Sequence, residues 1–209
     1  NKINVFVREA QENNIIVLLP DINKAKSLFS IEYTDAQKYI MCGFTAIKSV
    51  SEALGQYIHN ESSKKPFSNI FDFIERIPGK LLNRRSLESL ILVGCFDAIH
   101  HNRNQLLNNV EFIIAHGSIS ANEKLANQFS LIPMDSTNQT LKDGFEDFSP
   151  TIKAEYEFDL LGAFISFHPI TLYNDLLRQH KICNSDLLHK LPKGISHIKI
   201  AGVIQKKDS

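Results

Sequence analysis

The stretch that decides the fold is NRRSLESLILVGCFDA, residues 83–98. Asn83 is a favoured residue for the N-cap of a helix, and leucine and isoleucine then recur at the spacing of one helical face. Gly94 is typical of a helix end, and the chain then turns toward a second short helical piece that starts at Asp97. The pattern therefore predicts two helices joined by a tight hairpin.

A weaker copy of the same pattern lies upstream, at Lys48–Ala53. Residues 44–48 form a short helical turn, residues 49–50 turn the chain, and Ser51 can cap the helix that follows. Hairpins of this kind point backbone N–H groups and a helix N-terminus outward, a geometry suited to a phosphate. The two copies predict a tandem helix–hairpin–helix domain that contacts a nucleic-acid backbone and depends on its shape rather than on its base sequence.

The rest of the chain predicts a mainly α fold with a small β-hairpin near the N-terminus. Alternating apolar residues indicate the hairpin strands at 28–33 and 39–41. Residues 118–150 are rich in Ser, Asn, Asp and Thr, lack periodicity and indicate a long connector. The other predicted elements are a strand at 15–19, helices at 3–12, 52–60, 67–77, 102–117 (ended by Gly117), 152–165 and 172–180, and a final strand at 197–204.

The charge of the chain is balanced overall and uneven locally. The 209 residues have a formal net charge of zero, so the chain as a whole is not a basic nucleic-acid binder. Residues 64–103 carry seven Lys and Arg against four Asp and Glu, whereas residues 121–160 carry eight acidic residues against three basic ones. This asymmetry predicts one surface for an anionic partner, and two ordinary solvated faces are an alternative that is at least as common.

The cysteine content indicates the compartment. Cys42, Cys95 and Cys183 are few, odd in number and far apart, which predicts reduced thiols in a cytoplasmic protein. No apolar run approaches the ~20 residues of a membrane span, so no membrane partner is expected. The chain opens on Asn1 and closes on a strand that has no partner after it, which indicates a piece of a longer protein.

Five stretches of the chain resemble, in the same order, one family: the alpha subunit of the bacterial replicative DNA polymerase III. The stretches are Pro20–Asn23 (PDIN), Gly43–Glu52 (GFTAIKSVSE), Asn83–Asp97, Asn102–Leu107 (NRNQLL) and Leu161–Ile170 (LGAFISFHPI). Each motif alone is weak, but five in family order over nearly the whole chain are specific.

The resemblance implies a domain organisation. It assigns residues 1–41 to the tail of the fingers region, 42–117 to a tandem helix–hairpin–helix DNA-binding domain, 118–150 to a connector with a clamp-binding motif, 151–194 to a helical connector, and 195–209 to the first strand of a truncated OB-fold. The parent enzyme would be a DNA-directed DNA polymerase that uses Mg²⁺ held by carboxylates of its palm region. The present sequence contains no Asp-x-Asp pair, so no catalytic residue and no cofactor are expected in it.

The candidate DNA-binding residues cluster around the two hairpins. They are Lys48, Ser49, Val50, Ser51, Lys80, Arg84, Arg85, Gly94, Cys95, Phe96 and Arg103. The family carries glycines where this chain has Ser49 and Ser51, and glycine allows positive φ and close approach to a phosphate. We therefore expect the second hairpin to hold a primer–template duplex more tightly than the first. For each basic residue, an ordinary solvated position is an equal alternative.

A candidate partner-binding motif lies in the connector, at Gln128-Phe129-Ser130-Leu131-Ile132. A short polar-led motif with two apolar anchors suits docking into a pocket on a partner, and the resemblance implies the sliding clamp, with other replicative holoenzyme subunits as further partners. The alternative is a loop anchor that packs back on this chain. Elsewhere, His100-His101 lack the spacing of a metal site, His168 suits a turn, and Glu155, Glu157 and Asp159 are expected to form an exposed acidic surface.

Two readings from other classes remain open on the sequence alone. The chain could belong to a stand-alone helix–hairpin–helix DNA-binding or repair-scaffold protein with no polymerase attached. It could also be a purely structural helical domain whose hairpins pack internally. Within the polymerase reading, an error-prone paralogue would show much the same motifs.

Overall fold

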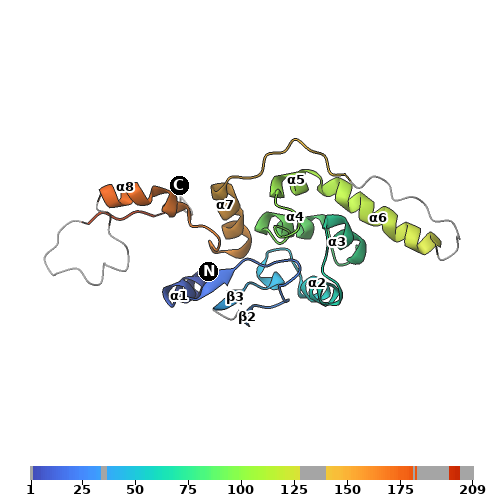
Figure 1. Cartoon of the computed structure of the whole chain (residues 1–209), viewed down its shortest axis with the longest axis horizontal. Helices are drawn as coiled ribbons and strands as arrows, with labels where there is room; N and C mark the ends of the chain where they lie inside the picture. The colour runs from blue at the N-terminus through green and yellow to red at the C-terminus, as the bar shows by residue number, and fades with distance from the viewer. Residues whose placement is uncertain (1, 34–36, 128–139, 181, 183–197, 203–209) are drawn as a thin grey trace, which may run out of the picture. The chain divides into compact units, whose positions relative to one another are not determined.

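The computed structural model describes residues 2–33, 37–127, 140–180, 182 and 198–202. It divides the chain into two compact units, Asn1–Ser166 and Phe167–Ser209, which are described separately. The elements of the first unit are α1 (Lys2–Glu12), β1 (Ile16–Leu18), β2 (Ser30–Tyr33), β3 (Lys38–Met41), η1 (Phe44–Ala46), α2 (Glu52–Lys64), α3 (Ile70–Arg76), α4 (Arg84–Val93), α5 (Arg103–Asn108), α6 (Val110–Asn127) and α7 (Pro150–Leu161) (Figure 1). The predicted mainly α fold is confirmed.

The N-terminal part is a three-stranded sheet rather than a hairpin alone. β2 and β3 pair antiparallel, which confirms the predicted hairpin, and β1 pairs parallel to the other edge of β3. α1 covers the β1 side of one face, where Val7, Ala10 and Val17 are buried together with Cys42. The apolar run 15–19 thus forms an edge strand whose central residue faces the core.

The loop after β1 joins the sheet to the helices. Ile22 is fully buried, and its N–H donates to the carbonyl of Cys95 at 2.8 Å. The Asn23 side-chain amide donates to the Phe67 carbonyl (3.0 Å) and its oxygen accepts from the Phe67 N–H (2.7 Å). The Pro20–Asn23 motif therefore fixes the sheet against both α3 and the second hairpin.

The helical core is built on aromatic residues from three successive segments. Phe67, Phe73 and Phe96 are at most 1% exposed and meet edge to face, with ring centroids 5.2 Å (Phe67–Phe73) and 5.0 Å (Phe73–Phe96) apart. Aromatic pairs favour this edge-to-face arrangement. The core thus ties the turn before α3 to the second hairpin.

The prediction of one helix over 102–117 is wrong in two respects. It divides into α5 and α6 at Asn109, whose buried side-chain amide bonds the carbonyls of Gln105 and Lys142. It also continues through Gly117 to Asn127. A Cβ on Gly117 would lie 2.6 Å from Cγ1 of Ile74, so this glycine allows α6 to approach α3 and does not end the helix.

α7 also differs from its prediction at the C-terminal end. It ends at Leu161, four residues before the predicted Ile165, because Gly162 adopts the left-handed conformation (φ 80°) that closes many helices. The N-terminal end, by contrast, is set by Ser149, whose side chain accepts from the N–H of Ile152.

The second unit contains η2 (Pro169–Tyr173) and α8 (Asn174–Gln179). His168 caps η2 through its ring nitrogen, which accepts from the Ile170 N–H at 3.2 Å, in agreement with the predicted turn role. Residues 198–202, the described part of the expected OB-fold strand, have no regular secondary structure. A strand exists only with a hydrogen-bonded neighbour, and none is present there among the described residues. No helix in the described ranges combines the length and the hydropathy that crossing a membrane requires.

Candidate nucleic-acid interface

The first hairpin has buried walls and an exposed tip. Phe44, Ile47 and Val50 are at most 8% exposed and anchor the hairpin in the core, whereas Lys48 and Ser49 between them are exposed. Three apolar anchors around a two-residue tip hold the backbone of the tip in one conformation. A fixed, exposed tip with a lysine is suited to a phosphate.

The two serines of this hairpin have different roles. Ser49 takes the left-handed backbone conformation (φ 71°), which in a residue other than glycine costs roughly 1–2 kcal/mol. Ser51 has an ordinary extended conformation (φ −77°) and caps α2, because its hydroxyl accepts from the Leu54 N–H at 3.2 Å. Ser49 therefore adopts the hairpin conformation at the cost of backbone strain, whereas Ser51 stabilises the start of α2 as its cap.

The first turn of α4 lies directly against this tip. The Ser86 hydroxyl donates to the Ser49 carbonyl at 2.6 Å. Asn83 caps α4 by accepting from the Ser86 N–H at 2.9 Å, as the sequence predicts. The tip, the N-terminus of α2 and the N-terminus of α4 therefore share one region of the surface, and both helices are long enough for their dipoles to favour an anion there.

The basic residues near the tip differ in how far their charge is already neutralised. Arg84 pairs with Glu88 at 2.7 Å and also with Glu111. Lys48 and Arg85 are exposed and, among the described residues, form no ion pair. Lys80 is exposed on the turn after α3. Lys48 and Arg85 are therefore the cations best placed to meet a phosphate at the tip.

The second hairpin is closed rather than open. Gly94 ends α4 in the left-handed conformation (φ 93°), as the sequence predicts, but Cys95 and Phe96 are at most 1% exposed. The N–H groups of Gly94 and Cys95 donate back to the carbonyls of α4. The expectation that Gly94, Cys95 and Phe96 present an open cradle is not met, because apolar packing draws this turn inward.

Arg103 is buried beside the second hairpin and does not face solvent. Its guanidinium donates twice to Asp97 (2.6 and 3.0 Å) and once to the carbonyl of Leu92 (2.9 Å). Its side chain is 4% exposed and lies over Gly94. The Arg103 side chain therefore does not lie on the surface where the sequence prediction places a phosphate contact, because each of its three nitrogens already donates to an acceptor inside the protein.

A carboxylate from α7 completes this buried cluster. Glu157 is fully buried, lies 3.9 Å from the Arg103 guanidinium, and accepts from the hydroxyl (2.6 Å) and N–H (3.0 Å) of Ser166. The expectation that Glu157 is exposed is wrong, because the turn after α7 folds back over it. Sequence spacing gave no signal for this pair, which forms only when α7 packs on α4.

The sequence that forms this pair of hairpins is similar to known proteins. A sequence model of the helix-hairpin-helix motif matches residues 14–106. The whole chain (100%) aligns at 36% identity over 233 residues with the DNA polymerase III subunit alpha of Rickettsia bellii, of which it covers 20%. The chain belongs to the DNA polymerase III alpha subunit family.

More distant relatives in this family give the same result. The DNA polymerase III subunit alpha of Caulobacter vibrioides is 25% identical over 99% of this chain and 18% of its own length. The subunit of the same name from Bacillus subtilis is 30% identical over 85% of this chain and 15% of its own length. The chain spans about a fifth of the length of the curated relatives it matches most strongly.

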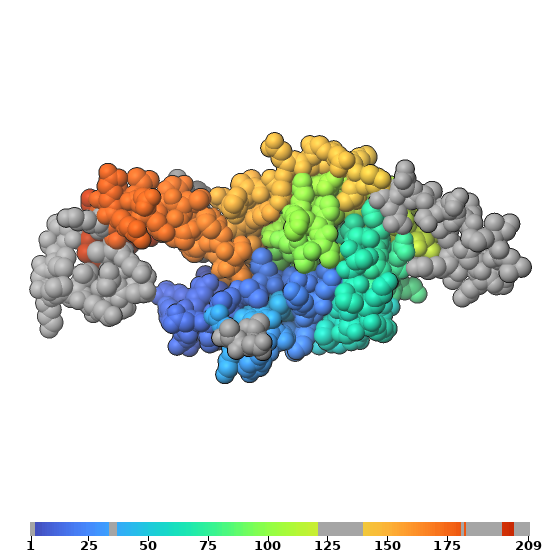
Figure 2. Space-filling view, in the orientation of Figure 1, coloured from blue at the N-terminus to red at the C-terminus, as the bar shows by residue number. Residues whose placement is uncertain are grey.

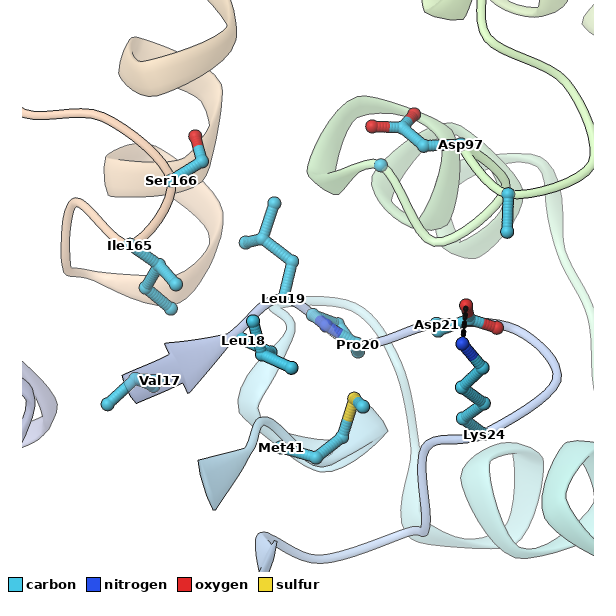
Figure 3. Close-up of a pocket in the computed structure, with 12 residues that line it drawn as sticks. Val17, Leu18, Leu19, Pro20, Asp21, Lys24, Met41, Asp97, Ile165 and Ser166 are labelled. Atoms are coloured by element: carbon cyan, nitrogen blue, oxygen red, sulfur yellow. Dashed lines mark ion pairs between the residues drawn. The ribbon is translucent and has the colours of Figure 1, made fainter. Parts of the chain in front are cut away.

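A hollow beside the second hairpin of this alpha-subunit segment is poorly suited to DNA. It has a volume of about 310 Å³, and apolar side chains such as Leu19 and Ile165 line it. Asp97 stands at its edge, across from the ion pair of Asp21 and Lys24 (3.8 Å) (Figure 3). The lining is mostly apolar, and the charged groups at its edge are already paired, Asp97 with Arg103 and Asp21 with Lys24, so this side of the second hairpin offers a phosphate no unpaired cation among its lining residues.

The sequence also predicts a partner-binding motif and no metal site. The clamp-binding residues Gln128–Ile132 lie outside the described residues. The part of the chain that the structure describes contains no group of three or more His, Cys, Asp or Glu side chains that could hold a metal ion.

Proposed function

We propose that this chain holds duplex DNA by its backbone, as part of an alpha subunit that carries out template-directed DNA synthesis. One observation carries the proposal: the exposed Lys48–Ser49 tip lies against the N-terminus of α4, next to Arg85. Two helix N-termini and two cations at one point suit phosphate oxygens. We place the main DNA contact at the first hairpin, reversing the sequence expectation, because the second is turned inward.

The proposal predicts a loss of affinity when the two cations are removed together. Lys48→Ala with Arg85→Ala should weaken binding to a 20-bp duplex about tenfold near 0.1 M salt, because two phosphate contacts disappear. The slope of log affinity against log salt should become shallower by about 2, since each contact releases about one counterion. Fluorescence anisotropy at four salt concentrations measures both quantities.

Lys65→Ala is the matched control for this experiment. Lys65 is an exposed lysine at the other end of α2, roughly 20 Å from the tip by the rise of the helix. It should leave both affinity and salt slope nearly unchanged. An equal loss in the control, or an unchanged slope in the double variant, would contradict a phosphate site at the first hairpin and support hairpins that only pack internally.

We also propose that Gln128–Ile132 binds the sliding clamp and so tethers the polymerase near the primer end. Tethering raises the effective concentration of the enzyme there even when the peptide contact is weak. Gln128→Ala with Leu131→Ala should weaken clamp binding about 100-fold, measured by surface plasmon resonance with immobilised clamp, because an anchor of this type contributes roughly 1–2 kcal/mol. Binding that survives the double change would move the clamp contact elsewhere in the chain.

The free thiols of Cys42 and Cys95 support a reducing compartment, and we propose the cytoplasm. Burial, reinforced by the negative charge of Glu157, raises the pKa of Cys42 to about 12, so this thiol is unreactive at neutral pH.

The stand-alone DNA-binding alternative would share the hairpins. The match of the whole of this chain to a fifth of the alpha subunits favours the polymerase.

A further inference from the structure

Residues 140–149, which we call the strap, lie along α5 after the long helix α6. Figure 2 shows them in yellow to orange against the green surface of this part of the molecule. The composition of these residues predicted only a connector. The structure holds them instead by a row of four amide side chains: Asn104 and Gln105 of α5, and Asn102 and Asn109, which flank α5 on either side.

The amides bind mainly the backbone of the strap; the one strap side chain that they contact is the carboxylate of Asp143, which accepts from Gln105 at 2.8 Å. Gln105 and Asn109 both donate to the carbonyl of Lys142, at 3.2 Å each, and Asn109 also accepts from the Lys142 N–H at 2.9 Å. Further along, the amide donors reach the next carbonyls: Asn102 to Phe145 at 2.6 Å, and Asn104 to Glu146 at 2.7 Å. Contacts of this kind recognise an extended backbone and are indifferent to most of its sequence.

The end of the strap is held by charge. Asp147 accepts from the backbone N–H of Arg103 at 3.0 Å and pairs with Lys153 of α7. Burial opposes ionisation of this carboxyl, but the Lys153 ammonium and the backbone N–H donors outweigh it and keep the pKa of Asp147 below its ordinary value. The carboxylate is therefore charged at neutral pH.

Little apolar surface supports these polar contacts. No residue of the strap is buried, and only Leu141, Phe145 and Phe148 are even partly buried. α5 keeps one cap without the strap, because Asn102 accepts from the Gln105 N–H at 2.8 Å, while Asp147 of the strap caps the first N–H of the helix. A segment with many exposed hydrogen bonds and few buried contacts belongs to the least stable part of a fold.

We propose that the strap is a releasable latch. It detaches from α5 as one cooperative segment, while the helices beneath it stay folded. Its release would open one wall of a hollow of about 440 Å³, which the strap residues Thr140, Leu141 and Asp143 line together with Phe71 and Ile99. It would also free the ten residues of the strap itself. The reach of a flexible segment grows roughly with the square root of its length. A partner bound before Thr140 would therefore gain reach when the strap is released. Of the two consequences of release, only this gain in reach rests on the proposed clamp contact.

Amide hydrogen exchange on the 209-residue chain tests the latch without DNA or clamp. The amide of Lys142 is a direct reporter, because it donates to Asn109. We expect the two strap amides that have acceptors, those of Lys142 and Phe148, to exchange together, at least ~10-fold faster than those of α4. Asn104→Ala with Gln105→Ala should accelerate them a further ~10-fold and leave α4 unchanged, since the amide contacts with the strap are lost.

Asn108→Ala is the matched control, because Asn108 lies on the same helix and bonds only Asn104 among the described residues. It should not change exchange in the strap. Asp143→Ala removes the Gln105 contact (2.8 Å) from the strap side, so it tests the latch even if the double variant fails to fold. Exchange of the strap at the rate of α4, or equal acceleration by Asn108→Ala, would overturn the latch and make the strap part of the core.

Discussion

Gly94→Ala should lower the free energy of unfolding by about 2–4 kcal/mol, one of the largest effects of any single methyl group in this chain. Two causes add. The residue has φ 93°, a conformation that alanine adopts only with strain of about 1–2 kcal/mol. The new Cβ would also lie 2.2 Å from a terminal nitrogen of Arg103, so the guanidinium must move.

The second cause is large because this arginine cannot move freely. An exposed arginine would swing away at little cost, but the Arg103 side chain is 4% exposed and bonded to Asp97 and to the Leu92 carbonyl. Displacing it weakens charge-assisted bonds, each contributing roughly 1.5–3 kcal/mol in a buried setting. Urea unfolding followed by circular dichroism measures the loss.

Gly144→Ala separates the two causes. Gly144 has the same φ of 93°, but nothing lies within 4 Å of its added Cβ. It should therefore show only the backbone strain, about 1–2 kcal/mol at most, and less if the strap opens on its own. Equal losses at the two glycines would mean that Arg103 yields easily, and that the buried cluster does not hold the second hairpin.

The second hairpin shows which parts of this fold the sequence can predict. The helix there begins after Asn83 and ends at Gly94, as expected, because capping and the left-handed turn depend on residues adjacent in the chain. The direction in which the hairpin faces was predicted wrongly. That direction depends on tertiary packing: Cys95 and Phe96 are buried in the core, and beside them Arg103 and Glu157 meet only after α7 has packed on α4.

In the candidate site, too, the local features were predicted from the sequence and the tertiary contacts were not. Lys48 and Ser49 were found from the hairpin pattern, and they are exposed as a phosphate contact requires. The contact of Ser86 with Ser49 was missed, since it joins two hairpins distant in sequence. The strap was missed for the same reason, although the amide-rich run at 102–109 was a usable signal for a backbone-binding surface.

Glu157→Ala should lower the free energy of unfolding by about 2–4 kcal/mol. The carboxylate is fully buried and accepts from the N–H groups of Ile165 (3.3 Å) and Ser166 (3.0 Å) and from the Ser166 hydroxyl (2.6 Å). Alanine leaves these donors without their acceptor and leaves Arg103 with Asp97 as its one carboxylate partner among the described residues. Thermal and urea unfolding measure the change.

Glu155→Ala is the control for this variant. Glu155 is an exposed carboxylate two residues earlier on the same helix, so its loss should change stability by less than about 0.5 kcal/mol. If the two variants unfold alike, the buried cluster contributes nothing and α7 is held by apolar packing alone.

The thiol of Cys42 gives a second readout that a general loss of stability would not reproduce. Burial is the main reason its pKa stands at about 12, and the charge of Glu157 adds to it. Glu157→Gln keeps the volume and removes the charge, so it should lower the pKa of Cys42 and move the pH profile of its alkylation to lower pH, measured by mass spectrometry under native conditions. A loss of stability alone would raise the rate at every pH, because Cys42 is fully buried, and would not move the profile. Because Gly94→Ala disturbs Arg103 without touching this carboxylate, it should destabilise the fold and leave that pKa in place.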